Sequence, residues 1–227
     1  MWISYVEPFF ELDDFQIVAL TAYLENRGGG TDGMQSVINV IQNRALYDVS
    51  YGYAEQDIVT ATGSKYFGVC LAYEQFSSYN LGNSQRGIAL RLSTPDAFNA
   101  EIQTNTSLAL AYALALQLKA GTLLDITGGA NHYFALGITI PMWATTMVYR
   151  TTIKGQAFYS AAPYLSQNPQ KYILPLTNAG STTEIAPNPP SSVSTTTPPV
   201  ATQGSTTAVQ NPDALAITIP STIIGTL

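Results

Sequence analysis

The sequence predicts an α+β fold, with helices in the first part of the chain and a small antiparallel sheet late in it. Apolar residues recur at helical spacing over residues 13–45, and an Ala- and Leu-rich run follows at 108–118. Residues 147–153 and 156–160 are rich in β-formers, and Lys154-Gly155 between them is typical of a hairpin turn. Helices followed by antiparallel strands are the pattern of α+β domains.

The composition limits the domain number and the function classes. A chain of 227 residues allows one domain with appendages or at most two small ones. Hydrophobic residues make up 46% of the chain, which is enough to form a core. Charged residues make up 11%, so the surface is mostly uncharged and polar. The net charge is −6 with nine Lys and Arg, which argues against nucleic acid as a partner.

Targeting and cofactor signals are sparse. The most apolar run, residues 108–118, is too short to cross a bilayer, so no membrane span is predicted. The first residues lack the basic start of a signal peptide. Cys70 is the single cysteine, and we interpret it as a small hydrophobic residue rather than half of a Cys–His nucleophile pair. One His and no Cys cluster argue against a metal site, and no cofactor is predicted.

The first half of the chain predicts two consecutive helices. Residues 1–12 are aromatic and are interpreted as an N-terminal docking segment that covers part of the core. Asp13 or Asp14 then caps a helix that ends at Gly28-Gly29-Gly30, because glycine tolerates the left-handed conformation that closes helices. Thr31 or Asp32 starts a second helix, which ends at Asn43-Arg44.

The middle of the chain predicts a mixture of elements. A short helix is expected near 55–61 and an extended segment at 65–70. Residues 73–80 combine amides, hydroxyls and aromatic rings, which suits a carbohydrate cleft but also an ordinary surface loop. The run Ser93-Thr94-Pro95-Asp96 predicts the entry of a helix that reaches Ala120 and forms a buried central pillar, because it is apolar on most faces.

The composition changes near residue 163. Residues 163–227 are rich in Ser, Thr and Pro and carry few charges, so they cannot bury a core of their own. Residues 216–224, close to the end, are uncharged and β-prone, which would make a free end adhesive. We therefore predict a domain at 13–162 and an extended tail at 163–227 that serves as an anchor to a partner.

Glu25 is the candidate catalytic group. It lies on the last turn of the helix that the glycines terminate, next to apolar and aromatic residues. A carboxylate in such surroundings can serve as a general acid. A solvated glutamate at a helix end would give the same local sequence, so other motifs must decide between the two interpretations.

Six short motifs in order resemble the cell-wall hydrolase family that includes spore-cortex-lytic enzymes. Members of that family carry Glu-Ala-Arg-Gly-Glu, Asn-Arg at a helix end, Gln-Phe-Ser, Thr-Gly-Gly-Ala-Thr-His-Tyr-Phe, a Trp, and a late Phe-Tyr pair. The corresponding residues here are Glu25-Asn26-Arg27-Gly28, Asn43-Arg44, Gln75-Phe76-Ser77, Thr127-Gly128-Gly129-Ala130-Asn131-His132-Tyr133-Phe134, Trp143 and Ala157-Phe158-Tyr159. The resemblance covers about residues 14–160. Gly29 stands where the family has its second Glu, and Gln156 stands where it usually has His.

The resemblance implies a lysozyme-like α+β domain that cleaves the glycan strands of peptidoglycan. It places the catalytic acid on Glu25. The matched positions expected to bind substrate are Gln75, Phe76, Ser77, Thr127, Gly128, His132 and Tyr133. A plain turn at Thr127-Gly128-Gly129 and a structural role for His132 and Tyr133 are the alternatives. Since family members are similar to lytic transglycosylases, one catalytic carboxylate would suffice here.

Two function classes follow for the whole chain. The first is a peptidoglycan-cleaving enzyme, a lytic transglycosylase or muramidase carried in a phage virion and acting in the bacterial periplasm or cell wall. In that case residues 163–227 would join it to other phage structural proteins. The second is a catalytically decayed structural virion protein that uses the same fold and tail for assembly. Non-catalytic glycan binding and a free endolysin are weaker alternatives.

Overall fold

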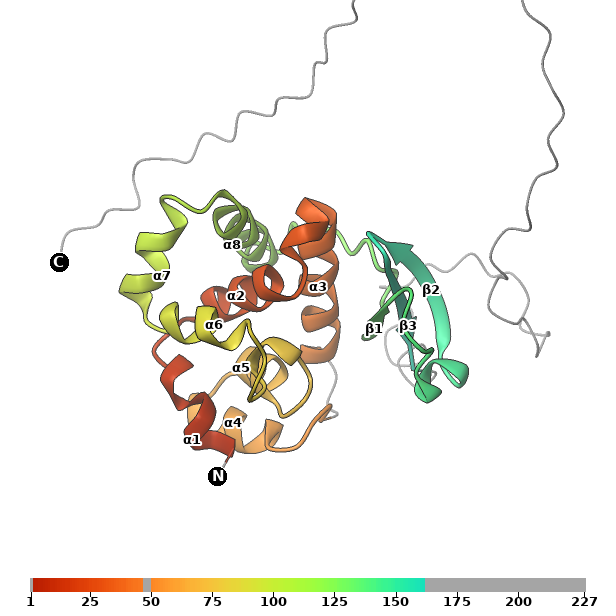
Figure 1. Ribbon diagram of the computed structural model, residues 1–227, viewed down its shortest axis with the longest axis horizontal. Helices are drawn as coiled ribbons and strands as arrows, with labels where there is room; N and C mark the ends of the chain where they lie inside the picture. Colours follow the sequence, from red (N-terminus) through yellow and green to blue (C-terminus); the bar gives the residue numbers. More distant parts are fainter. Residues whose placement is uncertain (1, 47–49, 162–227) are drawn as a thin grey trace, which may run out of the picture. The chain divides into compact units, whose positions relative to one another are not determined.

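The computed structural model describes residues 2–46 and 50–161, and the predicted anchor in the tail lies outside them (Figure 1). Helices occupy the chain up to residue 119, and three antiparallel strands follow, which confirms the predicted α+β class. The elements are α1 Trp2–Val6, η1 Glu7–Phe9, α2 Asp14–Asn26, η2 Arg27–Gly29, α3 Gly30–Ala45, α4 Glu55–Thr62, α5 Lys65–Leu71, η3 Ser77–Tyr79, α6 Arg86–Arg91, α7 Pro95–Ile102, α8 Thr106–Lys119, β1 His132–Ala135, η4 Met142–Thr145, β2 Val148–Ile153 and β3 Gln156–Ser160.

Helix α2 is the central helix of the domain. Asp13 caps it, because its carboxylate accepts the backbone N–H groups of Phe15 and Gln16 while Gln16 accepts the N–H of Asp13. Every residue from Gln16 to Leu24 is buried. The sequence had predicted the Ala- and Leu-rich helix for this place, but α8 buries only one face, on which Leu108, Ala111, Leu114, Ala115 and Leu118 follow helical spacing.

The glycine run joins α2 to α3. Helix α2 ends at Asn26 as predicted, and one 3₁₀ turn connects it to α3. Within the run Gly28-Gly29-Gly30, only Gly30 has a positive φ, of 63°. Helix α3 begins at Gly30, slightly before the predicted start at Thr31 or Asp32. The sharp joint places the last turn of α2 beside the first turn of α3.

Two further predictions about the helices were wrong. Residues 65–71 form the helix α5 rather than an extended segment. Ser64 caps it, and a Cβ at Gly68 would meet the Val59 side chain and the Glu55 backbone, so the helix packs closely on α4. The helix entered at Thr94 stops at Ile102, and Asn105 caps a second one, because its Oδ1 accepts the N–H of Leu108 at 3.1 Å.

The N-terminal segment belongs to the main core. The indole Nε1 of Trp2 donates to the carbonyl oxygen of Leu71 at 2.7 Å. Val6, Phe9 and Leu12 are buried in the same apolar cluster as α2 and α8. The segment thus fills the side of the core formed by α5.

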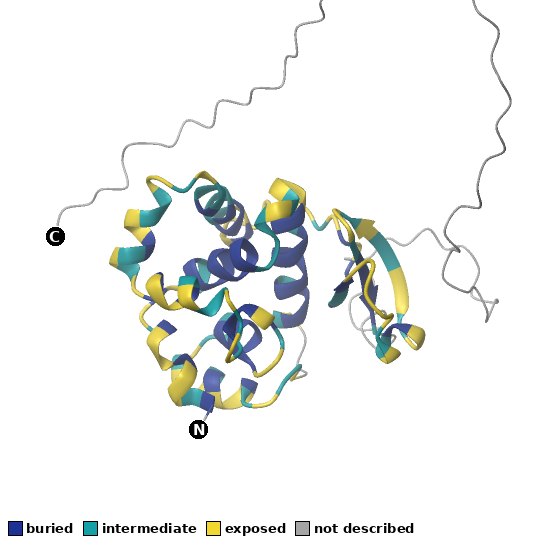
Figure 2. Cartoon of the chain, in the orientation of Figure 1, coloured by how far each residue is buried: buried dark blue, intermediate teal, exposed yellow. Residues whose placement is uncertain are grey.

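The sheet has the strand order β1-β3-β2, and all pairs are antiparallel. The hairpin through Lys154-Gly155 is confirmed, while β1 was not predicted. Tyr133 in β1 pairs with Phe158 in β3, and Phe158 packs with Ala130 against Val40 of α3. Figure 1 shows α3 as the helix next to the sheet, and Figure 2 shows its buried residues in dark blue. The sheet therefore meets the helices along α3, close to the end of α2.

Candidate active site

The carboxylate of Glu25 is held by groups from two distant parts of the chain. Its Oε1 accepts the backbone N–H of Ser78 at 3.0 Å and the Ser78 hydroxyl at 2.6 Å. Its Oε2 accepts the hydroxyl of Tyr133 at 3.3 Å. Ser78 lies in η3 and Tyr133 in β1, so the helical part and the sheet converge on one carboxylate. Glu25 itself is half-buried.

Ser78 is the site residue that the sequence prediction missed. The matched motif had ended at Ser77, which is exposed, whereas the next hydroxyl is buried and bonds Glu25. The two adjacent serines have the same local sequence context, so only the phase of the 3₁₀ turn at 77–79 distinguishes them.

Tyr133 is a hydrogen-bond donor at this site. Burial, with a further contribution from the neighbouring Glu25 carboxylate, raises the pKa of the Tyr133 phenol well above its usual value. The phenol therefore stays protonated over the working pH range and can donate to Glu25. It cannot serve as a base or as a phenolate nucleophile.

Arg27 is directed away from Glu25. Its Nη1 donates to Gln85 Oε1 at 2.9 Å, and its guanidinium lies 5.0 Å from the centre of the Tyr23 ring. The ion pairs among the described residues do not include one between Arg27 and Glu25. The hydrogen bonds to the Glu25 carboxylate therefore come from the uncharged groups of Ser78 and Tyr133.

Arg44 and Asn131 support the site next to the start of strand β1. The Arg44 Nε donates to the Asn131 carbonyl oxygen at 2.7 Å, and its guanidinium carbon lies 5.1 Å from the centre of the Tyr51 ring and 5.3 Å from that of Phe76. Phe76, predicted to bind substrate, is 1% exposed. The buried Phe76 ring packs against the Arg44 side chain, so we assign Phe76 to the positioning of Arg44.

His132 is neutral in the folded protein. Its Nδ1 lies 2.7 Å from Asn131 Oδ1, so Nδ1–H donates and Nε2 is left as an acceptor. Burial, and secondarily the charge of Arg44, lowers the pKa of His132 to about 4. Its ring lies 5.2 Å from Trp143 and 5.9 Å from Tyr51, centre to centre. A neutral, partly exposed ring among aromatic rings suits contact with a sugar face, and not acid catalysis near neutral pH.

The lowered pKa of His132 predicts a loss of stability in mild acid. Between pH 6.5, the ordinary histidine value, and about 4, the unfolded chain takes up a proton that the folded chain does not. We expect the free energy of unfolding to fall by about 1–2 kcal/mol across this window, a figure reduced for the ring's partial exposure. Urea titrations at pH 7 and pH 4.5 measure it. In His132→Gln the histidine contribution should be absent, and an unchanged pH dependence in that variant would contradict the assignment.

The loop before β1 is organised by Asp125. Its Oδ1 accepts the N–H and the hydroxyl of Thr127 at 2.8 and 2.6 Å, and its Oδ2 accepts Gly129 N–H at 2.9 Å and Asn43 Nδ2 at 3.0 Å. Thr127 is fully buried, so we assign it to shaping the loop rather than to contacting substrate. Gly128 is exposed, with a φ of 65°, at the tip of the turn.

Gln75 and Ser77 flank the segment that carries Ser78. Gln75 is half-buried, and its side chain lies against Gly52, where a Cβ would come within 2.8 Å of Gln75 Cγ. Ser77 is exposed, one residue before the serine that holds Glu25. Of the predicted substrate-binding residues, Tyr133 contacts Glu25 directly. Ser77 does not, but the next residue, Ser78, does.

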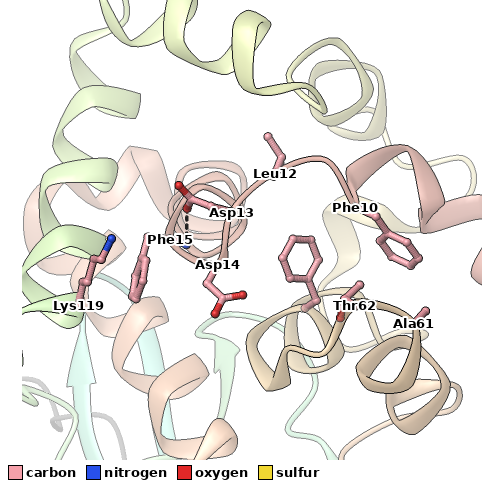
Figure 3. A pocket seen from close by; sticks show the side chains of 9 residues that line it. Phe10, Leu12, Asp13, Asp14, Phe15, Ala61, Thr62 and Lys119 are labelled. Atoms are coloured by element: carbon pink, nitrogen blue, oxygen red, sulfur yellow. Dashed lines mark hydrogen bonds between the residues drawn. The ribbon is translucent and has the colours of Figure 1, made fainter. Parts of the chain in front are cut away.

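A well-defined pocket lies away from Glu25. A hollow of about 500 Å³ is lined by Phe10, Leu12, Asp13, Asp14, Phe15, Ala61, Thr62, Phe67 and Lys119 (Figure 3). Asp13 caps the start of α2 and Glu25 lies in its last turn, so about 18 Å of helix separates the pocket from the carboxylate. We therefore do not place the chemistry in this pocket.

Cys70 is not available as a nucleophile. Its side chain is fully buried in the main core. Burial raises the pKa of the thiol to about 12, so it stays protonated. This confirms the interpretation of Cys70 as a small core residue.

A family model described as Cell Wall Hydrolase matches residues 28–159, more than half of the chain. The chain belongs to the cell wall hydrolase family. Searches among curated proteins and among solved structures found no match. The match includes Ser78, Tyr133 and the loop of Asp125, and it begins three residues after Glu25.

Membership of the family supports peptidoglycan hydrolysis in general terms, with peptidoglycan as the substrate. Over residues 2–46 and 50–161, no helix combines the length and apolar character needed to cross a bilayer. The same residues contain no group of three or more His, Cys, Asp or Glu side chains placed to hold a metal ion.

Proposed function

We propose that this cell wall hydrolase cleaves the glycan strands of peptidoglycan with Glu25 as its general acid and base. The observation that carries the proposal is the convergence of Ser78 and Tyr133 on the Glu25 carboxylate. A catalytic carboxylate must be fixed in position, and here three donors from two separated segments fix it. A solvated glutamate at a helix end would need no such support.

The two oxygens of Glu25 suit different tasks. Oε1 accepts two hydrogen bonds from Ser78, one of them at 2.6 Å, and is the anchored oxygen. Oε2 has one longer bond, from Tyr133. Oε2 is therefore the atom that would hold the transferable proton and deliver it to the glycosidic oxygen as the C1–O bond breaks.

A single-carboxylate mechanism is the form of cleavage that we favour. A hydrolase with the usual pair needs a second free carboxyl group across the scissile bond. The two candidates after Glu25 lie just before matched motifs. They are Asp125, whose oxygens both accept hydrogen bonds within its own loop, and Glu74, which is exposed at a φ of 61°. In a lytic transglycosylase the deprotonated Glu25 would instead accept the proton of the sugar 6-hydroxyl, as that oxygen attacks C1 and closes a 1,6-anhydro ring.

Mass spectrometry of digested peptidoglycan tests this proposal. A transglycosylase releases anhydro ends, which are lighter by one water molecule than the reducing ends that a hydrolase releases. Anhydro products support the single-carboxylate mechanism, and reducing ends would refute it. If purified protein releases no fragments at all, the result favours the alternative of a catalytically decayed structural protein.

Replacing Ser78 by Ala is expected to lower kcat by about tenfold to a hundredfold. The change removes one short hydrogen bond to a charged oxygen, which contributes about 1.5–3 kcal/mol, while the backbone N–H of residue 78 remains. Ser77→Ala is the matched comparison, since its hydroxyl is exposed and should affect KM rather than kcat. Steady-state turnover of soluble glycan fragments measures both. Equal kcat losses in the two variants would contradict the role given to Ser78.

We also propose that the domain acts from a phage virion, with residues 163–227 as its attachment to other structural proteins. The support is the uncharged Ser-, Thr- and Pro-rich composition of that segment and its β-prone stretch at 216–224. Removing the chain beyond about residue 165 should leave cleavage intact and abolish incorporation into particles. Normal incorporation of the shortened chain would overturn the attachment role.

A further inference from the structure

We propose that Asn26 and Gln156 form a positioning pair that ties the sheet to the end of α2 and so fixes Tyr133 against Glu25. Asn26 directly follows Glu25, and its Nδ2 donates to Gln156 Oε1 at 2.8 Å. The role in catalysis rests on the function proposed above for Glu25. The pair itself stands on the geometry alone.

The register of the sheet makes the tie effective. Gln156 in β3 pairs with Ala135 in β1, and Ala135 is two residues from Tyr133 on the same strand. Residues two apart on a strand lie on the same face, and so do paired residues on neighbouring strands. Tyr133 and Gln156 therefore contact α2 from one face of the sheet. The sheet thus contacts two successive residues of α2, through Tyr133 to Glu25 and through Gln156 to Asn26. Since β3 pairs with β1, loss of the contact at Gln156 would let the strand that carries Tyr133 shift relative to Glu25.

Two glycines make room for the Asn26 side chain. A Cβ at Gly29 would lie 2.7 Å from Asn26 Oδ1, and a Cβ at Gly33 would lie 2.9 Å from Asn26 Cγ and Nδ2. Gly29 has a φ of −81°, which any residue adopts, so the requirement at Gly29 is spatial. A side chain there would displace the amide that reaches Gln156.

The pair also accounts for two departures of this chain from the motif that it resembles. Gly29 and Gln156 occupy the positions where a Glu and a His were expected. Gln156 accepts a hydrogen bond from the Asn26 side chain, and a Cβ at Gly29 would collide with that same side chain. One uncharged amide contact therefore connects them. Because neither amide titrates, the tie holds the sheet without changing the charge next to Glu25.

The first experiment compares Gln156→Met with Gln156→Glu. Met keeps the length of the side chain and loses the acceptor, so kcat should fall roughly tenfold, the effect of a slight misplacement, with KM within about twofold. Glu keeps an acceptor for Asn26 Nδ2 but adds a negative charge near Glu25, which shifts the pH profile. Measured at the pH optimum of each variant, the kcat of Gln156→Glu should stay within about threefold of wild type. An unchanged kcat in Gln156→Met, or equal losses in both variants, would overturn the proposal.

The second experiment uses the space at Gly29. Gly29→Ala should lower kcat as Gln156→Met does, because the new methyl group displaces Asn26. In an Asn26→Ala background the same change should cost nothing further, since the displaced group is gone. Losses that simply add would show that Gly29 acts independently of Asn26, and would count against the proposal.

The third experiment needs no activity, so it separates this inference from the proposed function. The losses of melting temperature in Asn26→Ala and Gln156→Ala should not add in the double variant. The double variant should melt no lower than the less stable of the two single variants. The Tyr133 ring resonances in NMR spectra should shift in Gln156→Met. If wild type cleaves no peptidoglycan but both results hold, the function fails and the pair stands. Additive melting losses or an unmoved Tyr133 signal would refute the pair.

Discussion

Glu25→Gln is expected to abolish lysis of peptidoglycan, with a fall in turnover of about 10³-fold or more. General acid–base assistance contributes about 10²–10⁴-fold to one step, and here the same carboxylate would serve in two. Gln has the shape of Glu, and its amide oxygen can still accept both donors of Ser78. The variant therefore removes the transferable proton and keeps the hydrogen bonds from Ser78 that hold the side chain in place. Zymography and release of soluble fragments measure the loss.

The melting temperature of Glu25→Gln provides the control, and it should stay within a few degrees of wild type. A variant that clears peptidoglycan as well as wild type would show that the catalytic carboxylate lies elsewhere. The test matters because the family match begins at residue 28 and so does not reach Glu25. Glu25→Asp should keep a small fraction of activity, since its shorter side chain withdraws the proton from the glycosidic oxygen.

Asp125→Ala is expected to give the largest loss of stability of the changes considered, about 3 kcal/mol. It removes the acceptor for four donors, of which Thr127 and Asn43 belong to fully buried residues. Donors left without a partner each cost about 1–3 kcal/mol, and water entering at the loop recovers part of that. For a domain of this size the melting temperature should fall by about 10 °C. Calorimetry or a thermal melt followed by circular dichroism measures the change.

Asp125→Asn is the matched control. It keeps one oxygen for Thr127 and replaces the other by an NH₂ group that cannot accept from Gly129 or Asn43. The loss should therefore be intermediate, with Asp125→Ala the less stable variant. Equal melting temperatures for wild type and Asp125→Ala would mean that the loop holds its shape without the carboxylate.

The sequence was most informative where one local signal had one structural solution. The helix start at Asp13 or Asp14, the helix end at the glycines and the hairpin at Lys154-Gly155 were all predicted, because caps and turns depend on neighbouring residues. Residues 65–71 were mispredicted because a short apolar run fits a buried strand as well as a helix. There the close approach of α4 to Gly68 decides, and that contact is tertiary.

The candidate site shows the same division. Glu25 and Tyr133 were predicted, and the structure brings them together. Ser78, Asn26 and the roles of Phe76 and Thr127 depend on which side of a turn or strand faces the carboxylate. A change of one residue in register exchanges an exposed hydroxyl for a buried one, and no pattern in the sequence fixes that register.

The sheet has only a small apolar cluster of its own, made of Phe134, Ala144, Ala157 and Tyr159, while the main core belongs to the helices. We expect a sheet of three strands with so little buried surface to open at a lower free energy than the helices. Tyr133 leaves Glu25 whenever it does. Catalysis should therefore have its own, lower tolerance to heat and denaturant than the helical signal, so that a preparation with intact helices can already have lost its lytic power.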